Sequence, residues 1–137
     1  MPGHLVIIPT YNERENISDI IDAVQNLGRN FHVLIVDDGS PDGTADLVKE
    51  AMDKYEGRIH LEEREGKLGL GTAYVHGFRY ALDRSFDYVY EMDADFSHNP
   101  EDLLRMSQEL ETKETDVVIG SRYVKGGKLE NWPLDRI

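Results

Sequence analysis

Asp93 and Asp95 stand one residue apart in the segment EMDADFSHNP, which follows an apolar run and leads to Pro100. Two carboxylates at positions i and i+2 around a bend can share one hard divalent cation, Mg²⁺ or Mn²⁺, with water and phosphate oxygens as further ligands. The alternative is a helix cap, in which Asp95, Ser97 or Asn99 accepts a hydrogen bond from the helix after Pro100. A cap leaves Asp93 unexplained, so the two aspartates are candidate metal ligands.

A second acidic pair, Asp37 and Asp38, ends the apolar segment FHVLIVDDG. Adjacent carboxylates at a buried strand end repel each other unless a cation or a hydrogen-bond donor lies beside them. The residues from Ser40 to Thr44 are typical of a turn followed by a helix cap. A calcium-binding EF-hand loop is excluded, because a loop that begins at Asp38 puts Lys49 where the bidentate glutamate belongs.

Glycines and basic residues supply candidate phosphate contacts. The stretch GKLGLGTAYVHG, residues 66–77, has the spacing G-x-x-G-x-G, which is not the dinucleotide-binding fingerprint. These glycines permit either a tight entry to a helix or a loop whose Lys67 and neighbouring amides approach phosphate. Arg122 follows the apolar run VVIG, where it can meet a diphosphate or form a surface ion pair. Tyr11 either stacks on a base or covers the sheet edge. His98 is a ligand, a proton-transfer group or simply a loop residue.

Apolar periodicity predicts the elements that position these groups. Near-continuous apolar runs predict buried strands over about residues 5–8, where Pro9 ends the strand, and 31–39. A short third strand is predicted over 58–63, and two more within FDYVYEMDAD and DVVIGSRY. Helical spacing predicts helices over about residues 17–27 and 45–55, one ending near residue 83, and one that begins at Pro100. Alternating strands and helices with short connections predict a doubly wound, mostly parallel α/β sheet with helices on both faces.

This architecture predicts where the polar groups meet. In open α/β sheets, ligands bind at the carboxyl ends of the strands. The polar clusters at residues 9–13, 37–43, 93–98 and 120–122 each lie just past a predicted strand. They are therefore expected at one edge of the sheet.

Size and composition limit the class of protein. A chain of 137 residues with 39% hydrophobic and 31% charged residues suits one globular domain with a core. Its 15 basic and 27 acidic residues argue against nucleic-acid binding. The chain has no cysteine, which excludes thiolate metal sites and is compatible with a reducing compartment. The apolar run LVII near the N-terminus is far shorter than a signal-peptide core or a membrane span.

Taken in order, five segments resemble the family 2 glycosyltransferases, and more narrowly the dolichol-phosphate (polyprenol-phosphate) mannose synthases: IIPTYNERENI, VLIVDDGSPDGT, GKLGLGTAYVHG, MDADFSHNPEDL and VVIGSRYVKGG. The resemblance implies a GT-A (Rossmann-like) fold. It also implies inverting transfer of mannose from GDP-mannose to a polyprenyl (dolichyl) phosphate, with Mg²⁺ or Mn²⁺. Such a protein is expected in the cytoplasm, peripheral on the cytoplasmic face of a membrane through its lipid acceptor.

The resemblance implies roles for residues that contact the nucleotide sugar. Pro9, Tyr11 and Glu13 match the first nucleotide-contacting loop, and Asp38 matches the carboxylate that faces the base. Lys67 is a further expected substrate contact on the glycine-spaced loop.

Other matches concern the diphosphate and the metal. Asp93 and Asp95 match a D-x-D pair near ribose, diphosphate and metal, and Arg122 matches a diphosphate-contacting arginine. These three are the expected catalytic residues. Ser97 stands where some members have a metal-ligating glutamine, so water is expected in that place.

Two alternatives stay open. A related family 2 transferase would use UDP-glucose or another nucleotide sugar, since Asp38 can accept hydrogen bonds from guanine or uracil. A nucleotide-binding module without turnover is the other. The family's catalytic domain continues beyond this sequence with an apolar acceptor region. Residues 1–137 are therefore expected to be the N-terminal nucleotide-sugar-binding part of a GT-A catalytic domain, incomplete at the C-terminus.

Overall fold

A computed structural model of the chain describes residues 3–65, 70–97 and 99–112. The described residues up to Pro100 form one compact unit, and the helix α4 (Asp102–Thr112) belongs to a second. The predictions that lie outside the described residues are the fifth strand at DVVIGSRY, the phosphate contacts of Lys67 and Arg122, and the role of His98. No helix in the described ranges combines the length and the apolar character needed to cross a bilayer.

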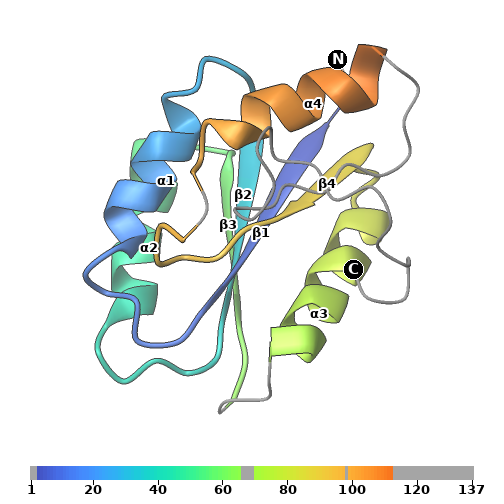
Figure 1. The fold of residues 1–137 in the computed structure, drawn as a ribbon. Helices are drawn as coiled ribbons and strands as arrows, with labels where there is room; N and C mark the ends of the chain where they lie inside the picture. Colours follow the sequence, from blue (N-terminus) through green and yellow to red (C-terminus); the bar gives the residue numbers. More distant parts are fainter. Residues whose placement is uncertain (1–2, 66–69, 98, 113–137) are drawn as a thin grey trace. The chain divides into compact units, whose positions relative to one another are not determined.

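The described part of the first unit contains a sheet of four parallel strands (Figure 1), β1 (His4–Thr10), β2 (Phe31–Asp37), β3 (Ile59–Glu63) and β4 (Tyr88–Glu91). Their order in the sheet is β3-β2-β1-β4. The chain therefore adds strands on one side of β1 and then returns to the other side with β4. A reversal of this kind is the topological switch point at which doubly wound sheets bind ligands.

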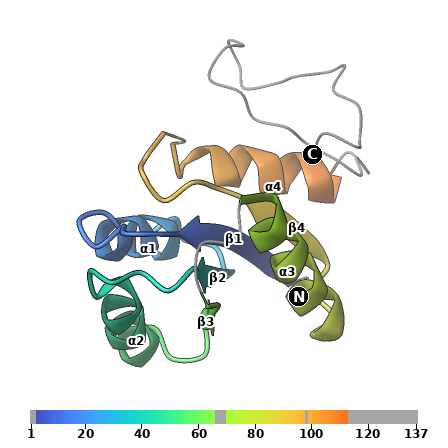
Figure 2. The ribbon, with the colours of Figure 1, turned by 90° about the horizontal axis from the view of Figure 1, so that it is seen from below.

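Helices cover both faces of this sheet (Figure 2). The helices α1 (Ile17–Gln25) and α2 (Thr44–Lys54) lie on one face, and α3 (Leu70–Asp83) lies on the other. Burial on both faces explains why β1 and β2 are almost continuously apolar. The core beneath α3 includes Leu5, Ile7, Leu34, Val36, Ala73, Tyr80 and Ala81.

Pro9 does not end the first strand, contrary to the prediction from sequence, because β1 continues to Thr10. The carbonyl of Ile7 accepts a hydrogen bond from the N–H of Met92 (3.0 Å), so Ile7 faces β4. The backbone of Pro9, two residues later, points in the same direction, towards β4. β4 stops pairing with β1 at Glu91, opposite Ile7. The N–H that proline lacks would therefore point beyond the end of the β1–β4 pairing, and no hydrogen bond to β2 is lost.

The other predicted elements are present with small shifts at their ends. α1 ends at Gln25 and its C-cap is Asn26, so Gly28, with φ of 83°, lies two residues beyond the cap and is not the cap itself. The N–H of Leu27 bonds to the carbonyl of Val24 (3.3 Å), which tightens the last turn before Gly28. α4 begins at Asp102, two residues later than predicted.

Gly77 of α3 lies directly on Ile7 of the central strand. A Cβ at position 77 would lie 2.7 Å from Cδ1 and Cγ2 of Ile7. Gly77→Ala therefore forces α3 or Ile7 to move, an overpacking that costs about 1–3 kcal/mol. The better helix propensity of alanine offsets about 1 kcal/mol of this cost. We expect Gly77→Ala to lower the free energy of unfolding in urea titrations.

Gly71, in the same helix, is the matched control for this prediction. A Cβ added there meets nothing within 4 Å, so Gly71→Ala should stabilise the protein by about 0.5–1 kcal/mol. Equal stabilisation by both substitutions would contradict the close contact between α3 and β1.

A chain of polar side chains joins β2, β3 and α3 near the amino ends of the two strands. Nδ1 of His32 lies 3.1 Å from Nε2 of His60, and the hydroxyl of Tyr80 lies 2.8 Å from Nδ1 of His60. Burial lowers the pKa of His60 to about 4, and the charges of His32 and Arg84 add to this effect. Burial and the charge of Arg58 also lower the pKa of His32. Both imidazoles are therefore held neutral in the folded protein.

We expect the protein to lose stability as the pH falls from 7 to 5. Histidine in the unfolded chain titrates near pH 6.5, so between about 6.5 and 4 the unfolded state binds more protons than the folded state. For His60 the loss by pH 5 is about 1–2 kcal/mol. Urea titrations across this range test it, and His60→Gln should flatten the dependence. An unchanged slope in His60→Gln would assign the acid sensitivity to other groups.

Candidate functional site

The loops that follow β1 and β2 lie beside each other (Figure 1), and three successive backbone amides of the first loop donate hydrogen bonds to side chains of the second. The three bonds are Asn12 N to Ser40 Oγ (2.8 Å), Glu13 N to Thr44 Oγ1 (3.1 Å) and Arg14 N to Asp42 Oδ2 (3.1 Å). The sequence predicts only a turn and a helix cap for residues 40–44. Asp42 does accept a bond from the N–H of Thr44 (3.0 Å) at the start of α2, but the same segment also holds the neighbouring loop.

The predicted nucleotide contacts Pro9, Tyr11 and Glu13 lie at the end of β1 and in the loop after it, which is hydrogen-bonded to residues 40–44. Pro9 is half-buried within β1, and Tyr11, just beyond the strand, is 38% exposed. Asn12 follows in the left-handed conformation, with φ of 55°. The carbonyl of Glu13 accepts the N–H groups of Asn16 (3.0 Å) and Ile17 (2.9 Å), which starts α1.

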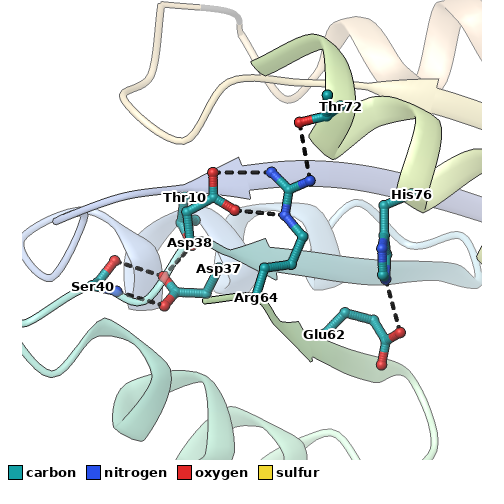
Figure 3. Close-up of polar contacts among 8 residues, drawn as sticks. All are labelled: Thr10, Asp37, Asp38, Ser40, Glu62, Arg64, Thr72 and His76. Carbon is teal, nitrogen blue, oxygen red and sulfur yellow. Dashed lines mark hydrogen bonds and ion pairs between the residues drawn. The ribbon is translucent and has the colours of Figure 1, made fainter. Parts of the chain in front are cut away.

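Asp37 and Asp38 have separate partners, and this separation relieves their repulsion (Figure 3). Asp37 accepts hydrogen bonds from the hydroxyls of Thr10 (2.6 Å) and Ser40 (2.7 Å) and from the N–H of Ser40 (2.9 Å). Asp38 forms a bidentate ion pair with Arg64, with Nε to Oδ1 at 2.7 Å and Nη2 to Oδ2 at 3.0 Å. The side chains of Arg64 and Asp38 are only 8% and 9% exposed.

Arg64 is a site residue that the sequence analysis did not identify. It follows β3, and its own N–H donates to the carbonyl of Asp37 (2.8 Å). Its Nη1 donates to the hydroxyl of Thr72 in α3 (3.1 Å), as Figure 3 shows. One further turn along α3, Nε2 of His76 lies 3.0 Å from Oε1 of Glu62. The available signal was a basic residue placed directly after the third strand, at the same sheet edge as two acidic strand ends.

The loop after β4 holds the two predicted metal ligands. Asp93 is half-buried, and its Oδ1 accepts a bond from the hydroxyl of Tyr74 (3.3 Å). Its Oδ2 accepts a bond from the hydroxyl of Ser97 (3.4 Å), whose N–H donates to Oδ1 of the exposed Asp95 (2.9 Å). Burial, with the charges of Asp93 and Glu91, raises the pKa of Tyr74 above its ordinary value. The tyrosine hydroxyl therefore keeps its proton and acts as the donor.

The side chains present fit a divalent cation that shares its shell with substrate. Asp93 and Asp95 supply carboxylate oxygens, which are the ligands that Mg²⁺ and Mn²⁺ prefer. Within the part of the chain that the structure describes, no group of three His, Cys, Asp or Glu side chains is placed to hold a metal. Most of the shell would then come from water and phosphate oxygens, as is usual for Mg²⁺.

The sheet order brings three of the four predicted clusters together. β2, β1 and β4 are neighbours and run parallel, so their carboxyl ends lie at one edge. Asp37 and Asp38, the loop with Tyr11, and Asp93 with Asp95 follow these three strand ends. The fourth cluster, at residues 120–122, lies outside the described residues.

Comparisons with known proteins agree with this arrangement. The family model described as "Glycosyl transferase family 2" matches residues 5–137 of this chain. The chain is 48% identical over 133 residues to the polyprenol monophosphomannose synthase of Mycolicibacterium smegmatis, covering 97% of this chain and 50% of that protein. It is 46% identical over 132 residues to the undecaprenyl-phosphate mannosyltransferase of Micrococcus luteus, covering 96% and 53%.

The similarity extends to a third curated relative. The chain is 42% identical to the dolichol-phosphate mannosyltransferase of Pyrococcus furiosus over 133 residues, which is 96% of this chain and 36% of that protein. The chain therefore spans about half the length of the first two relatives and about a third of the last.

Solved structures show the same fold. The mannosyltransferase PcManGT from Pyrobaculum calidifontis, in complex with GDP-Man and Mn²⁺, is 30% identical, with a TM-score of 0.54 over 58% of this chain and 24% of that one. TarS 1–349 from S. aureus, in complex with UDP, is 23% identical with a TM-score of 0.73 over 94% of this chain and 38% of that one, a likeness of fold alone. The predicted GT-A (Rossmann-like) α/β fold is confirmed. The family match from residue 5 to residue 137 and the parallel sheet with its acidic strand ends show that this chain belongs to glycosyl transferase family 2.

Proposed function

We propose that residues 1–137 form the nucleotide-sugar-binding part of an inverting transferase that moves mannose from GDP-mannose to a polyprenyl (dolichyl) phosphate. One observation supports this most strongly. Three relatives at 42–48% identity, each aligned over at least 96% of the chain, are all named for mannose and a polyprenol-type phosphate. The GDP-Man complex of PcManGT supports the same donor.

The end of β2 is the proposed base site. Arg64 donates to both carboxylate oxygens of Asp38 and fixes the orientation of that carboxylate. Asp38, held in this orientation, is proposed to accept hydrogen bonds from the N–H groups on the edge of guanine. Tyr11 and Glu13, on the loop fastened to residues 40–44, then contact the nucleoside from the neighbouring strand end.

The end of β4 is the proposed diphosphate site, with Asp93 and Asp95 as ligands of Mg²⁺ or Mn²⁺. The cation, when bound, offsets the charge of the departing nucleoside diphosphate. Such an offset matters in a chain of net charge -12, which repels a bare diphosphate. Lys67 and Arg122 are proposed to add positive charge at the same place.

The transfer is proposed to be a single displacement. An oxygen of the acceptor phosphate forms a bond to the anomeric carbon while the bond from that carbon to the β-phosphate oxygen breaks. The electron pair of the broken bond leaves on GDP, and the configuration inverts. A phosphate monoester has a second pKa of about 6, so the attacking oxygen is already anionic near neutral pH. The chain therefore needs to position charge more than to supply a strong general base.

The acceptor sets the proposed location. A polyprenyl chain is held by the bilayer, so the protein would act peripherally at a membrane surface, on its cytoplasmic face. The distribution of charge gives no support to a nucleic-acid partner.

Nucleotide preference tests the proposed donor. We expect GDP to bind at least about tenfold more tightly than UDP with Mn²⁺ present, because the site is proposed to hydrogen-bond the guanine edge. Isothermal titration of both nucleotides against the whole protein that contains this chain measures the difference. Tighter binding of UDP would favour a related transferase with a uridine-linked donor.

A further inference from the structure

Both carboxylate oxygens of Asp93 have a hydroxyl donor, and the two donors come from different parts of the fold. Tyr74, on α3, donates to Oδ1 at 3.3 Å, and Ser97, on the same loop as Asp93, donates to Oδ2 at 3.4 Å. An ionised carboxylate only accepts hydrogen bonds, so the tyrosine hydroxyl directs its proton at Asp93. The contact joins residues 19 apart in sequence, which makes it a tertiary contact and not a property of the loop.

Tyr74 is held from three directions. Its ring packs against the core beneath α3. Three residues along the helix, Gly77 lies directly on Ile7 of β1, which fixes the height of α3 above the sheet. Two residues before Tyr74, Thr72 accepts a bond from Arg64 (3.1 Å), the residue that clamps Asp38. The hydroxyl of Tyr74 is therefore carried by a helix that is packed against the sheet. Ser97, in contrast, belongs to the same loop as Asp93, the residue whose orientation is to be set.

Resting on the proposed function, we infer that Tyr74 is a positioning residue of the metal site, whose hydroxyl sets the orientation in which Asp93 binds the cation. Tyr74 does not itself ligate the metal in this account. Partners that orient metal ligands are worth about 10–100-fold in metal affinity or activity when they are removed. The role also links the α3 segment TAYVHG to the acidic loop after β4.

Tyr74→Phe tests this role, with Tyr80→Phe as its matched control. Both substitutions remove one hydroxyl from α3, but the hydroxyl of Tyr80 contacts Nδ1 of His60 (2.8 Å) and not Asp93. The dissociation constant of Mn²⁺ is measured by electron paramagnetic resonance on the whole protein with GDP present. We expect Tyr74→Phe to weaken Mn²⁺ binding about tenfold or more and Tyr80→Phe to leave it within about twofold.

The shape of the Mn²⁺ resonance separates positioning from loss of stability. A changed ligand geometry alters the zero-field splitting of bound Mn²⁺ in Tyr74→Phe and not in Tyr80→Phe, whatever the two unfolding midpoints are. Mn²⁺ affinity and spectrum unchanged in Tyr74→Phe, with binding lost in Asp93→Asn, would overturn the inference alone. Absence of Mn²⁺ binding in the unsubstituted protein would overturn the proposed metal site together with the role of Tyr74.

Discussion

Asp95→Asn is expected to abolish the metal-dependent binding of GDP. Asparagine keeps the shape of the side chain but loses the charge, and a hard divalent cation needs the carboxylate. The loss should exceed about 100-fold in affinity, more than removal of an orienting partner costs. Because Asp95 is exposed in the turn after β4, the free energy of unfolding should change by less than about 0.5 kcal/mol. Calorimetric titration of GDP with Mn²⁺ and with EDTA measures the effect.

The helix-cap interpretation of Asp95 predicts the opposite pattern. A cap would tolerate asparagine, so Asp95→Asn would keep metal-dependent binding while Asp95→Ala would lose about 1 kcal/mol of stability. Asp83→Asn is the control for net charge, since Asp83 is an exposed aspartate at the far end of α3. Its GDP affinity should match that of the unsubstituted protein.

Asp38→Ala is expected to destabilise the fold as well as the base site. It removes one partner of a nearly buried ion pair, in which Arg64 and Asp38 are 8% and 9% exposed. The desolvated guanidinium of Arg64 then loses the counter-charge of Asp38, which costs about 3–5 kcal/mol. For a chain of this size that loss lowers the midpoint of thermal unfolding by about 10 °C or more. Calorimetric or urea unfolding of the variant tests it.

Two variants separate burial from charge in this prediction. The ion pair of Lys49 with Glu63 is 3.8 Å long with side chains 57% and 53% exposed, so Glu63→Ala should cost less than about 1 kcal/mol. The double variant Asp38→Leu with Arg64→Met removes both charges and should recover most of the stability lost in Asp38→Ala. It should not recover GDP affinity. Equal small losses in Asp38→Ala and Glu63→Ala would contradict a structural role for the buried pair.

The elements could be predicted because their signals are local. Every residue of β2 except His32 is buried, and such a strand has to be apolar along its whole length. The convergence of the acidic groups followed from topology, since parallel strands present their carboxyl ends at one edge. The predicted end of the first strand at Pro9 was wrong, because the effect of a proline depends on which neighbouring strand its backbone faces. A strand order, and not a sequence, decides that question.

The partners of the site residues could not be predicted, because they depend on tertiary contacts. Arg64 and Asp38, which form the ion pair, are 26 residues apart in sequence, and Tyr74 and Asp93, which share a hydrogen bond, are 19 residues apart. Ser40 has the sequence signature of a turn. Its hydroxyl also accepts a hydrogen bond from the backbone N–H of Asn12, which is 28 residues away in sequence. Local propensity indicates the first role and is silent on the second.

Transfer of mannose to a polyprenyl phosphate tests the proposed activity. The whole protein that contains this chain is incubated with GDP-mannose labelled in the sugar, a polyprenyl phosphate and Mn²⁺, and the label is counted in the organic extract and identified by mass spectrometry. We expect a lipid-linked mannosyl phosphate whose formation requires both the metal and Asp95. Label that stays in the aqueous phase, or lipid product formed equally well by Asp95→Asn in EDTA, would contradict it.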